Sequence, residues 1–192
     1  MRPTLKTTLL VAVLLPPAVW AYLQEQDPRP VNERGPANAP VTVVEYCEYG
    51  SQACAQLNVV VNGVMRDYQE RVRFVFHYLS PPEAKEPLQQ YAAFAAGAQG
   101  HFWEMHDMLF ANQDRASLSD LVGMAKQLRL DADKFRSDLS SQNIRDAARQ
   151  DRAIATAEGV TAAPTVVIDG RRLSTINTAR DLRVALQEAR AR

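Results

Sequence analysis

The two cysteines, Cys47 and Cys54, are the only thiols of the chain, so any thiol or disulfide chemistry depends on them. Two cysteines are too few for the disulfide framework that holds many small secreted domains together. The three histidines are scattered, and His101 and His106 are spaced so that a helix would not place them on one face as a ligand pair. We therefore expect no metal and no other cofactor, and structural or surface roles for the histidines.

Ser51 is the other side chain near the cysteines that could act as a nucleophile. A serine hydroxyl needs a neighbouring base to take its proton, and no histidine or lysine lies close to Ser51 in the sequence. An apolar pattern at helical spacing follows, from Leu57 to Tyr68. Serine is favoured at the position just before a helix, where its oxygen accepts a backbone N–H. The sequence therefore favours helix capping over catalysis for Ser51.

Composition and charge describe an ordinary soluble domain. The 192 residues include 22 basic and 22 acidic side chains, so the net charge is near zero. Proteins that bind nucleic acid through its phosphates usually carry an excess of Lys and Arg, and we expect no nucleic-acid partner. The length has room for one domain and an export segment.

Residues 1–23 have the layout of a signal peptide or a membrane anchor. Arg2 and Lys6 precede an uncharged run over residues 7–23, whose core from 9 to 15 is apolar. Basic residues before a short apolar run are typical of secretory signals, and the run is also about as long as the shortest membrane-spanning helices. The sequence thus predicts export, with this segment either cleaved or retained.

The rest of the chain predicts a linker over residues 24–39 and one α/β domain over residues 40–190. The linker is polar, aperiodic and rich in Pro, Asn and Arg. Short β-branched runs predict strands over 41–46, 72–78, 165–168 and 171–173. Helical spacing predicts a helix after Ser51 and further helices over 87–98, 102–111, 118–128, 132–139, 143–158 and 178–190. The order is βαβ, then a helical insertion at about 83–145, then ββα.

Three segments carry the most specific motifs. They are APVTVVEYCEYGSQAC (39–54), HFWEMHDMLFANQ (101–113) and GVTAAPTVVIDG (159–170). In this order they resemble the DsbA-like branch of the thioredoxin family: its strand leading into the redox motif, a helix of its inserted helical domain, and the loop with its cis-proline. The resemblance spans about residues 36 to 190. It implies a thioredoxin fold with a helical domain inserted between the βαβ and ββα halves, and thiol–disulfide interchange as the family's activity.

The resemblance also implies roles for single residues. It places Ser51 where the family has its nucleophilic cysteine and Cys54 where it has the resolving cysteine, so that Cys-X-X-Cys has become Ser-X-X-Cys. The family's reaction needs a thiolate at a helix N-terminus, which serine does not supply. Glu45 matches the buried acid that exchanges protons with the resolving cysteine. Pro164, with Ala163 before it, matches the cis-proline beside which extended substrates bind.

Cys47 has no counterpart in the family pattern. It could replace the lost nucleophile, or form a disulfide with Cys54 if the two Cα atoms lie within about 7 Å. A free, packed thiol is the default expectation for Cys47. Cys54 could be a buried structural cysteine or a slowly reacting lone thiol. Glu45 could be a retained proton-transfer group or a carboxyl that only hydrogen-bonds a neighbour.

Two functions follow from these expectations. The first is an exported, periplasmic or envelope, thiol–disulfide oxidoreductase with at most atypical monothiol activity through Cys54, acting on proteins or peptides that carry thiols or disulfides. The second is a non-catalytic, chaperone-like module that holds extended peptide beside Pro164. An engineered loss of the nucleophile at Ser51 is a third explanation, but Gln52 and Ala53 also differ from the family's Pro-aromatic pair, which favours natural divergence.

Overall fold

The computed structural model of the chain describes residues 32–68, 70–79, 88–173, 176 and 178–190. The predicted export segment, residues 1–23, lies outside the described residues, and so does the first half of the predicted linker, residues 24–31. Among the helices described, none combines the length and the apolar character needed to cross a bilayer.

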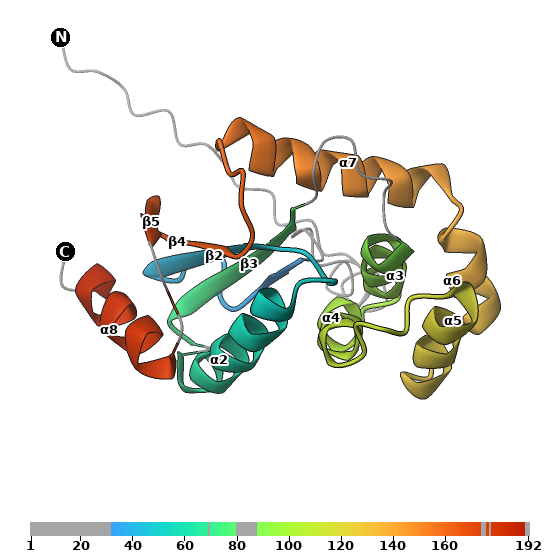
Figure 1. Cartoon of the computed structure of the whole chain (residues 1–192), viewed down its shortest axis with the longest axis horizontal. Coiled ribbons are helices and arrows are strands. Elements are labelled where there is room, and N and C mark those ends of the chain that lie inside the picture. The colour runs from blue at the N-terminus through green and yellow to red at the C-terminus, as the bar shows by residue number, and fades with distance from the viewer. Residues whose placement is uncertain (1–31, 69, 80–87, 174–175, 177, 191–192) are drawn as a thin grey trace, which may run out of the picture. The chain divides into compact units, whose positions relative to one another are not determined.

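The described residues form a five-stranded sheet, in the order β1-β3-β2-β4-β5, with helices on both faces (Figure 1). β2 and β3 are parallel and the other neighbouring strands are antiparallel. The strands are β1 (Glu33–Arg34), β2 (Val41–Cys47), β3 (Val72–Tyr78), β4 (Thr165–Ile168) and β5 (Arg171–Leu173). The helices are α2 (Gln52–Tyr68), α3 (Leu88–Gly97), α4 (Phe102–Ala111), α5 (Leu118–Gln127), α6 (Ala132–Asp138), α7 (Gln142–Ala157) and α8 (Ala179–Arg190).

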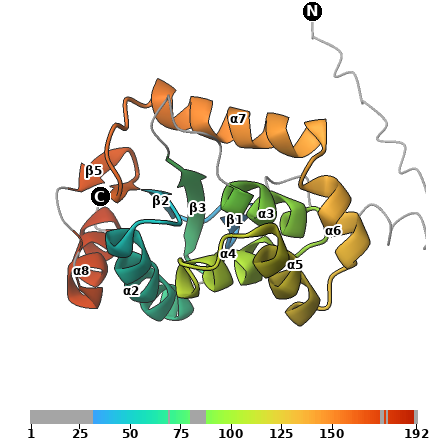
Figure 2. The same ribbon diagram turned by 45° about the vertical axis from the view of Figure 1, so that its right-hand side comes forward.

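This architecture confirms the predicted α/β class and the predicted order of elements. α2 joins β2 to β3 as in a βαβ unit, and the helices from α3 to α7 separate β3 from β4 along the chain. Figure 2 shows α3, α4, α5 and α6 gathered beside the sheet. The β4–β5 hairpin turns at Asp169 and Gly170, which both have positive φ (47° and 78°) as a tight two-residue turn requires.

β1 falls inside the segment predicted to be a linker, and that prediction is wrong for residues 33 and 34. They pair with β3 at the edge of the sheet. The backbone oxygen of Glu33 accepts the indole N–H of Trp103 at 3.3 Å, and the Arg34 guanidinium lies 4.2 Å from a Trp103 ring centre and 4.9 Å from that of Phe74. These partners are distant in sequence, so no local periodicity predicts the strand.

The two faces of the sheet bury different clusters. Because side chains alternate along a strand, Val41, Val43, Glu45 and Cys47 share one face of β2, toward the main core that includes residues of α2 and α8. Tyr46 lies on the other face, in a smaller cluster with residues of β4, α7 and the chain after it. Figure 1 shows α7 on that side of the sheet and α2 and α8 on the opposite side.

Asp151 fastens α7 to the sheet. Its Oδ1 accepts hydrogen bonds from His77 Nδ1 at 2.6 Å and from Asn32 Nδ2 at 3.0 Å. Its Oδ2 accepts the backbone N–H of Tyr78 at 2.7 Å. Asp151, His77 and Asn32 are all buried, and the structural role predicted for His77 is confirmed.

Candidate functional site

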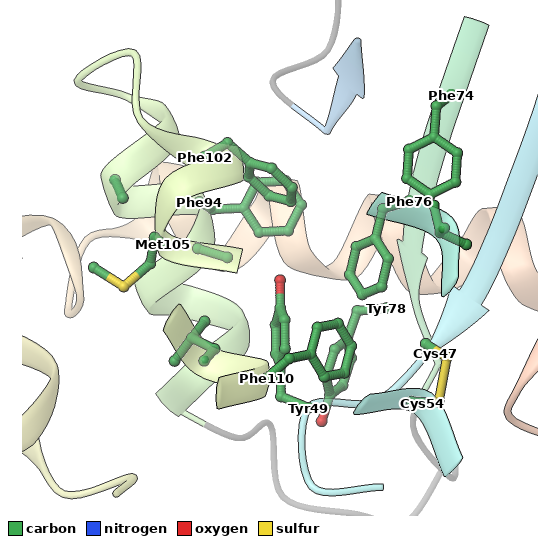
Figure 3. Packing of buried hydrophobic residues seen from close by; sticks show 14 of the residues in the cluster. Cys47, Tyr49, Cys54, Phe74, Phe76, Tyr78, Phe94, Phe102, Met105 and Phe110 are labelled. Carbon is green, nitrogen blue, oxygen red and sulfur yellow. A yellow bond between two sulfur atoms is a disulfide. The ribbon is translucent and has the colours of Figure 1, made fainter. Parts of the chain in front are cut away.

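A disulfide joins Cys47, the last residue of β2, to Cys54 in the first turn of α2 (Figure 3). The Cα atoms are 5.7 Å apart, and both residues have zero exposed surface. The expectation of a free Cys47 is therefore wrong, and so is the hypothesis of a lone thiol at Cys54. The loop between strand and helix reverses the chain and brings the start of α2 back over the end of β2, which spacing in the sequence does not reveal.

Ser51 caps α2, as the sequence predicts. Its Oγ accepts the backbone N–H of Cys54 at 3.3 Å, and its carbonyl accepts the N–H of Ala55 at 3.0 Å, which begins the helix. Gln113 fixes the preceding loop, since its Nε2 donates to the carbonyls of Tyr49 at 2.6 Å and Ser51 at 2.9 Å. Among the described residues no base contacts the Ser51 hydroxyl. Ser51 is partly exposed at the start of α2, whereas Cys47 and Cys54 are fully buried.

Glu45 is the most unusual group near the disulfide. It is completely buried, and neither carboxyl oxygen has a hydrogen-bond partner among the described residues. In the sheet it lies between Phe76 of β3 and Val166 of β4, two residues before Cys47 and on the same face. Burial raises the pKa of Glu45 to about 8.

Two charges modify this effect without cancelling it. The Arg34 guanidinium lowers the pKa of Glu45, while the Asp107 carboxylate raises it. Arg34 and Asp107 are themselves bridged by Asn62, whose Oδ1 accepts from Arg34 Nη2 at 2.8 Å and whose Nδ2 donates to Asp107 Oδ1 at 2.7 Å. Glu45 is therefore protonated at neutral pH and could donate or accept a proton near the disulfide.

The segment of Ala163 and Pro164 reaches the same end of the sheet as the disulfide. The bond between them is cis, as predicted from the resemblance. Thr165 pairs with Tyr46 in the β2–β4 ladder, so Pro164 comes level with Cys47 at the next step. Pro164 is exposed and Ala163 half-buried. The structure thus brings Ala163, Pro164, Cys47 and Cys54 to one end of the sheet.

Tyr49 and His106 support the loop before α2, a role that sequence reasoning missed. The Tyr49 hydroxyl lies 3.2 Å from His106 Nδ1, and His106 Nε2 lies 3.2 Å from Asn58 Oδ1. Burial, followed by the nearby Arg34 charge, lowers the pKa of His106 well below its usual value, so the ring is neutral. Figure 3 shows Tyr49 packed among Phe76, Tyr78 and Phe110. A single histidine in an aromatic helix carries no signal that would identify this partner. Within the described ranges, no group of three His, Cys, Asp or Glu side chains could hold a metal ion.

Residues 29–188 match the sequence profile of a family described as Thioredoxin. The chain belongs to the thioredoxin family. It is also 41% identical over 149 residues to a protein named Na(+)/H(+) antiporter NhaA 3 of Salinispora tropica, and 32% identical over 185 residues to the Na(+)/H(+) antiporter NhaA of Herminiimonas arsenicoxydans. These matches cover 76% and 96% of the chain but only 22% and 28% of the relatives, so the chain spans about a quarter of their length.

Solved structures of thioredoxin-like proteins share the fold. A thioredoxin-like oxidoreductase from Silicibacter pomeroyi superposes with a TM-score of 0.74 at 22% identity, covering 86% of this chain and 95% of that one. Oxidised BdbD from Bacillus subtilis gives 0.72 at 18% identity, covering 84% and 93%. The thiol-disulfide exchange protein alpha-DsbA2 from Wolbachia pipientis gives 0.72 at 16% identity, covering 89% and 92%. These likenesses establish the DsbA-like thioredoxin fold.

Loss of the disulfide is expected to destabilise the domain by about 2–3 kcal/mol, because the bond closes a loop of about eight residues in the unfolded chain. Urea unfolding of the oxidised protein and of the Cys47→Ala/Cys54→Ala variant measures the difference. Adding a reductant such as dithiothreitol to the oxidised protein should lower its stability, and the double variant should not respond. Equal midpoints for oxidised and reduced protein would contradict this prediction.

Proposed function

We propose that this chain is an exported thiol–disulfide exchange protein of the DsbA-like type, and that Cys47–Cys54 is its exchangeable bond. The observation that carries the proposal is the position of this disulfide, between the end of β2 and the first turn of α2, with the buried carboxyl of Glu45 on the same face of the strand. Export rests on the basic and then apolar residues at 1–23. The atypical monothiol reaction is replaced by a dithiol reaction that uses Cys47 in place of a cysteine at position 51.

The reaction balances without a cofactor. A substrate thiolate attacks the Cys47 sulfur, a mixed disulfide forms, and the electron pair of the broken S–S bond leaves on Cys54. Cys54 is the better leaving group because the N–H groups and the dipole at the start of α2 stabilise its thiolate. A second substrate thiolate then attacks the substrate sulfur, so the substrate leaves as a disulfide and the chain holds two thiols.

Glu45 and Pro164 have roles in the same scheme. Below its pKa of about 8 the Glu45 carboxyl holds a proton that could pass to a leaving thiolate. The exposed residue Pro164 is level with Cys47, so an extended substrate lying along that edge would present its sulfur to Cys47. Since both cysteines are buried, exchange requires the loop over residues 48–51 to move, and we expect it to be slow.

Trapping of a mixed disulfide tests the proposal. In Cys54→Ala, Cys47 keeps its thiol and should form a mixed disulfide with a peptide that carries an activated disulfide. In Cys47→Ala, the remaining thiol of Cys54 should form much less mixed disulfide with the same peptide. The Cys47→Ala/Ser51→Cys variant restores Cys-X-X-Cys on the same scaffold and should reduce or oxidise peptide faster than the natural chain, by roughly tenfold or more. If this variant is active while the natural chain neither traps peptide nor exchanges, Cys47–Cys54 is only structural.

The burial of both sulfurs favours a second candidate, a non-catalytic module that holds extended peptide. Ser51 fills the partly exposed helix terminus and cannot form a disulfide. This candidate predicts that binding of an unfolded, cysteine-free peptide survives in Cys47→Ala/Cys54→Ala. It also predicts that a bulky change at the exposed edge, such as Ala162→Trp, weakens that binding. Absence of any peptide binding would overturn it.

We also propose that the domain works beside a membrane transporter. The support is that curated relatives named Na(+)/H(+) antiporters contain a stretch similar to most of this chain within a protein several times longer. Co-purification of the tagged chain with an antiporter from membranes of its own organism tests this setting. Recovery of the chain without any antiporter after cross-linking would contradict it.

A further inference from the structure

A cavity of about 870 Å³ lies between α2 and α4, and nothing in the redox scheme uses it. Arg34 and Gly35 of the edge strand and the loop after it close one side. Its volume lies within the range of small-molecule sites, which are mostly apolar with a few placed polar groups. Its lining combines polar side chains with six apolar ones: Ala55, Val59, Met65, Val72, Phe110 and Ala111. Val59 is 73% exposed, the most exposed of the large apolar side chains described.

The polar groups of the cavity carry both signs of charge. Arg34 and Arg66 are basic and Asp107 is acidic. Within the part of the chain that the structure describes, the Arg34 guanidinium makes one hydrogen bond, from Nη2 to Asn62, and its buried Nε has no partner. Asp107 uses only Oδ1, which accepts from Asn58 at 3.2 Å and from Asn62 at 2.7 Å, so Oδ2 is free of the described residues. Asn58 and Asn62 hold the carboxylate in place.

The three charged groups of the cavity, Arg34, Arg66 and Asp107, select a class of ligand. A ligand with only a carboxylate can pair with Arg34 or Arg66 but is repelled by Asp107, and one with only an ammonium can pair with Asp107 but is repelled by both arginines. A zwitterion leaves neither charge opposed, because its ammonium can donate to Asp107 Oδ2 and its carboxylate can accept from Arg34. We propose that this cavity binds a small zwitterion with an apolar side chain, of the free amino acid class, with that side chain against Val59 and Phe110.

Titration calorimetry with three probes of one shape tests the class of ligand on the full chain. L-leucine carries both charges, isoamylamine lacks the carboxylate, and 4-methylpentanoate lacks the ammonium. We expect saturable binding of leucine with a Kd of about 1 mM or tighter. The two single-charge probes should bind roughly 10–100-fold more weakly, because each loses a hydrogen-bonded charge. Equal affinity for all three probes, or no saturable binding of leucine, would overturn the proposal.

Two substitutions place the binding in this cavity. A Cβ at Gly63, which lines the cavity, would meet no atom within 4 Å, so Gly63→Phe fills the space without disturbing the helix and should abolish leucine binding. Gly63→Ala controls for the change in helix propensity. Gly123→Phe, on α5 and equally unobstructed, controls for an added aromatic ring, and both controls should bind leucine normally. Leucine binding that persists in Gly63→Phe would overturn the assignment.

Asp107→Asn reverses the preference between probes. The amide keeps the shape of the carboxyl and an acceptor for Asn58 and Asn62 but removes the negative charge. Leucine should then lose about tenfold or more in affinity, and 4-methylpentanoate should gain, because it no longer meets a like charge. An unchanged order of affinities would show that Asp107 does not contact the ligand and would overturn the zwitterion assignment.

Discussion

Replacing Glu45 by glutamine is expected to abolish a large fall in stability between about pH 4.5 and pH 8. In the folded chain burial raises the pKa of this carboxyl from 4.5 to about 8. Within that window the folded state holds a proton that the unfolded state has released. Stability must therefore decrease as the pH rises, because ionisation favours the unfolded chain. The full penalty is of order 5 kcal/mol and is reached above pH 8.

The sign distinguishes Glu45 from an ordinary surface acid. An acid paired with a base has a lowered pKa and adds stability at neutral pH, whereas Glu45 adds stability only while it is protonated. Urea unfolding of oxidised wild type and of Glu45→Gln at pH 5 and pH 8 measures the effect. The free energy of unfolding of the variant, relative to that of wild type, should be much higher at pH 8 than at pH 5. Asp151, whose pKa is also raised by burial, is present in both proteins and cancels in this comparison.

An exposed acid gives the matched control. Glu104 lies on α4 with a side chain 54% exposed, so Glu104→Gln should leave the pH dependence of wild type unchanged. If Glu45→Gln retains the whole decline between pH 5 and pH 8, the carboxyl is not buried as a neutral group. The proton-transfer role proposed for it would then lose its basis, although exchange through Cys47 and Cys54 could be tested without it.

The features that could be predicted from the sequence are those that depend on residues close together in the chain. The β-branched run of β2 and the helical spacing of α4 are local patterns, and both elements appear where they were predicted. Ser51 was recognised as a cap for the same reason, since its partner is the N–H of Cys54 in the first turn of the helix. Burial of Glu45 also follows locally, because it stands in the middle of an apolar strand.

What could not be predicted depends on packing between distant segments. The Cys47–Cys54 bond is close in sequence, but whether it forms depends on how sharply the chain turns into α2, and Gln113 fixes that turn from far along the chain. β1 exists because Trp103 and β3 hold it. The partnership of Asp107 with Arg34 likewise needs α4 to lie against the edge strand. No pattern within either segment contains that information.

The location of the disulfide bears on the Ser-X-X-Cys site that the resemblance implies. The resemblance places Ser51 where the family has the partly exposed cysteine of its pair, but the described chain has no free thiol, because Cys47 pairs with Cys54. In the function proposed above, the exchangeable bond lies at the buried end of β2 and not at the partly exposed start of α2. A pair in that position is protected from adventitious reduction and depends on loop movement for reaction, which links any activity to the stability of the surrounding fold.

Asp151→Ala is expected to cost about 3–5 kcal/mol, because it leaves several buried donors without an acceptor. The carboxylate accepts from His77, Asn32 and the backbone of Tyr78, and these groups join α7, β3 and the chain before β1. Urea unfolding at neutral pH measures the loss. Hydrogen exchange should also show faster opening of α7 than in wild type.

Asp146 on the same helix provides the control. It is acidic and exposed, and among the described residues it bonds Gln142 and Arg149, both of α7 itself. Asp146→Ala should change stability by less than about 0.5 kcal/mol, as exposed helix pairs do. A loss from Asp151→Ala no greater than this would mean that the three donors find other acceptors. A cost of several kcal/mol would mean that a single carboxylate holds α7 on the face of the sheet opposite the disulfide. Changes to the Asp151 hydrogen bonds would then alter the rigidity of β3, the parallel neighbour of the strand that ends in Cys47, without changing the disulfide itself.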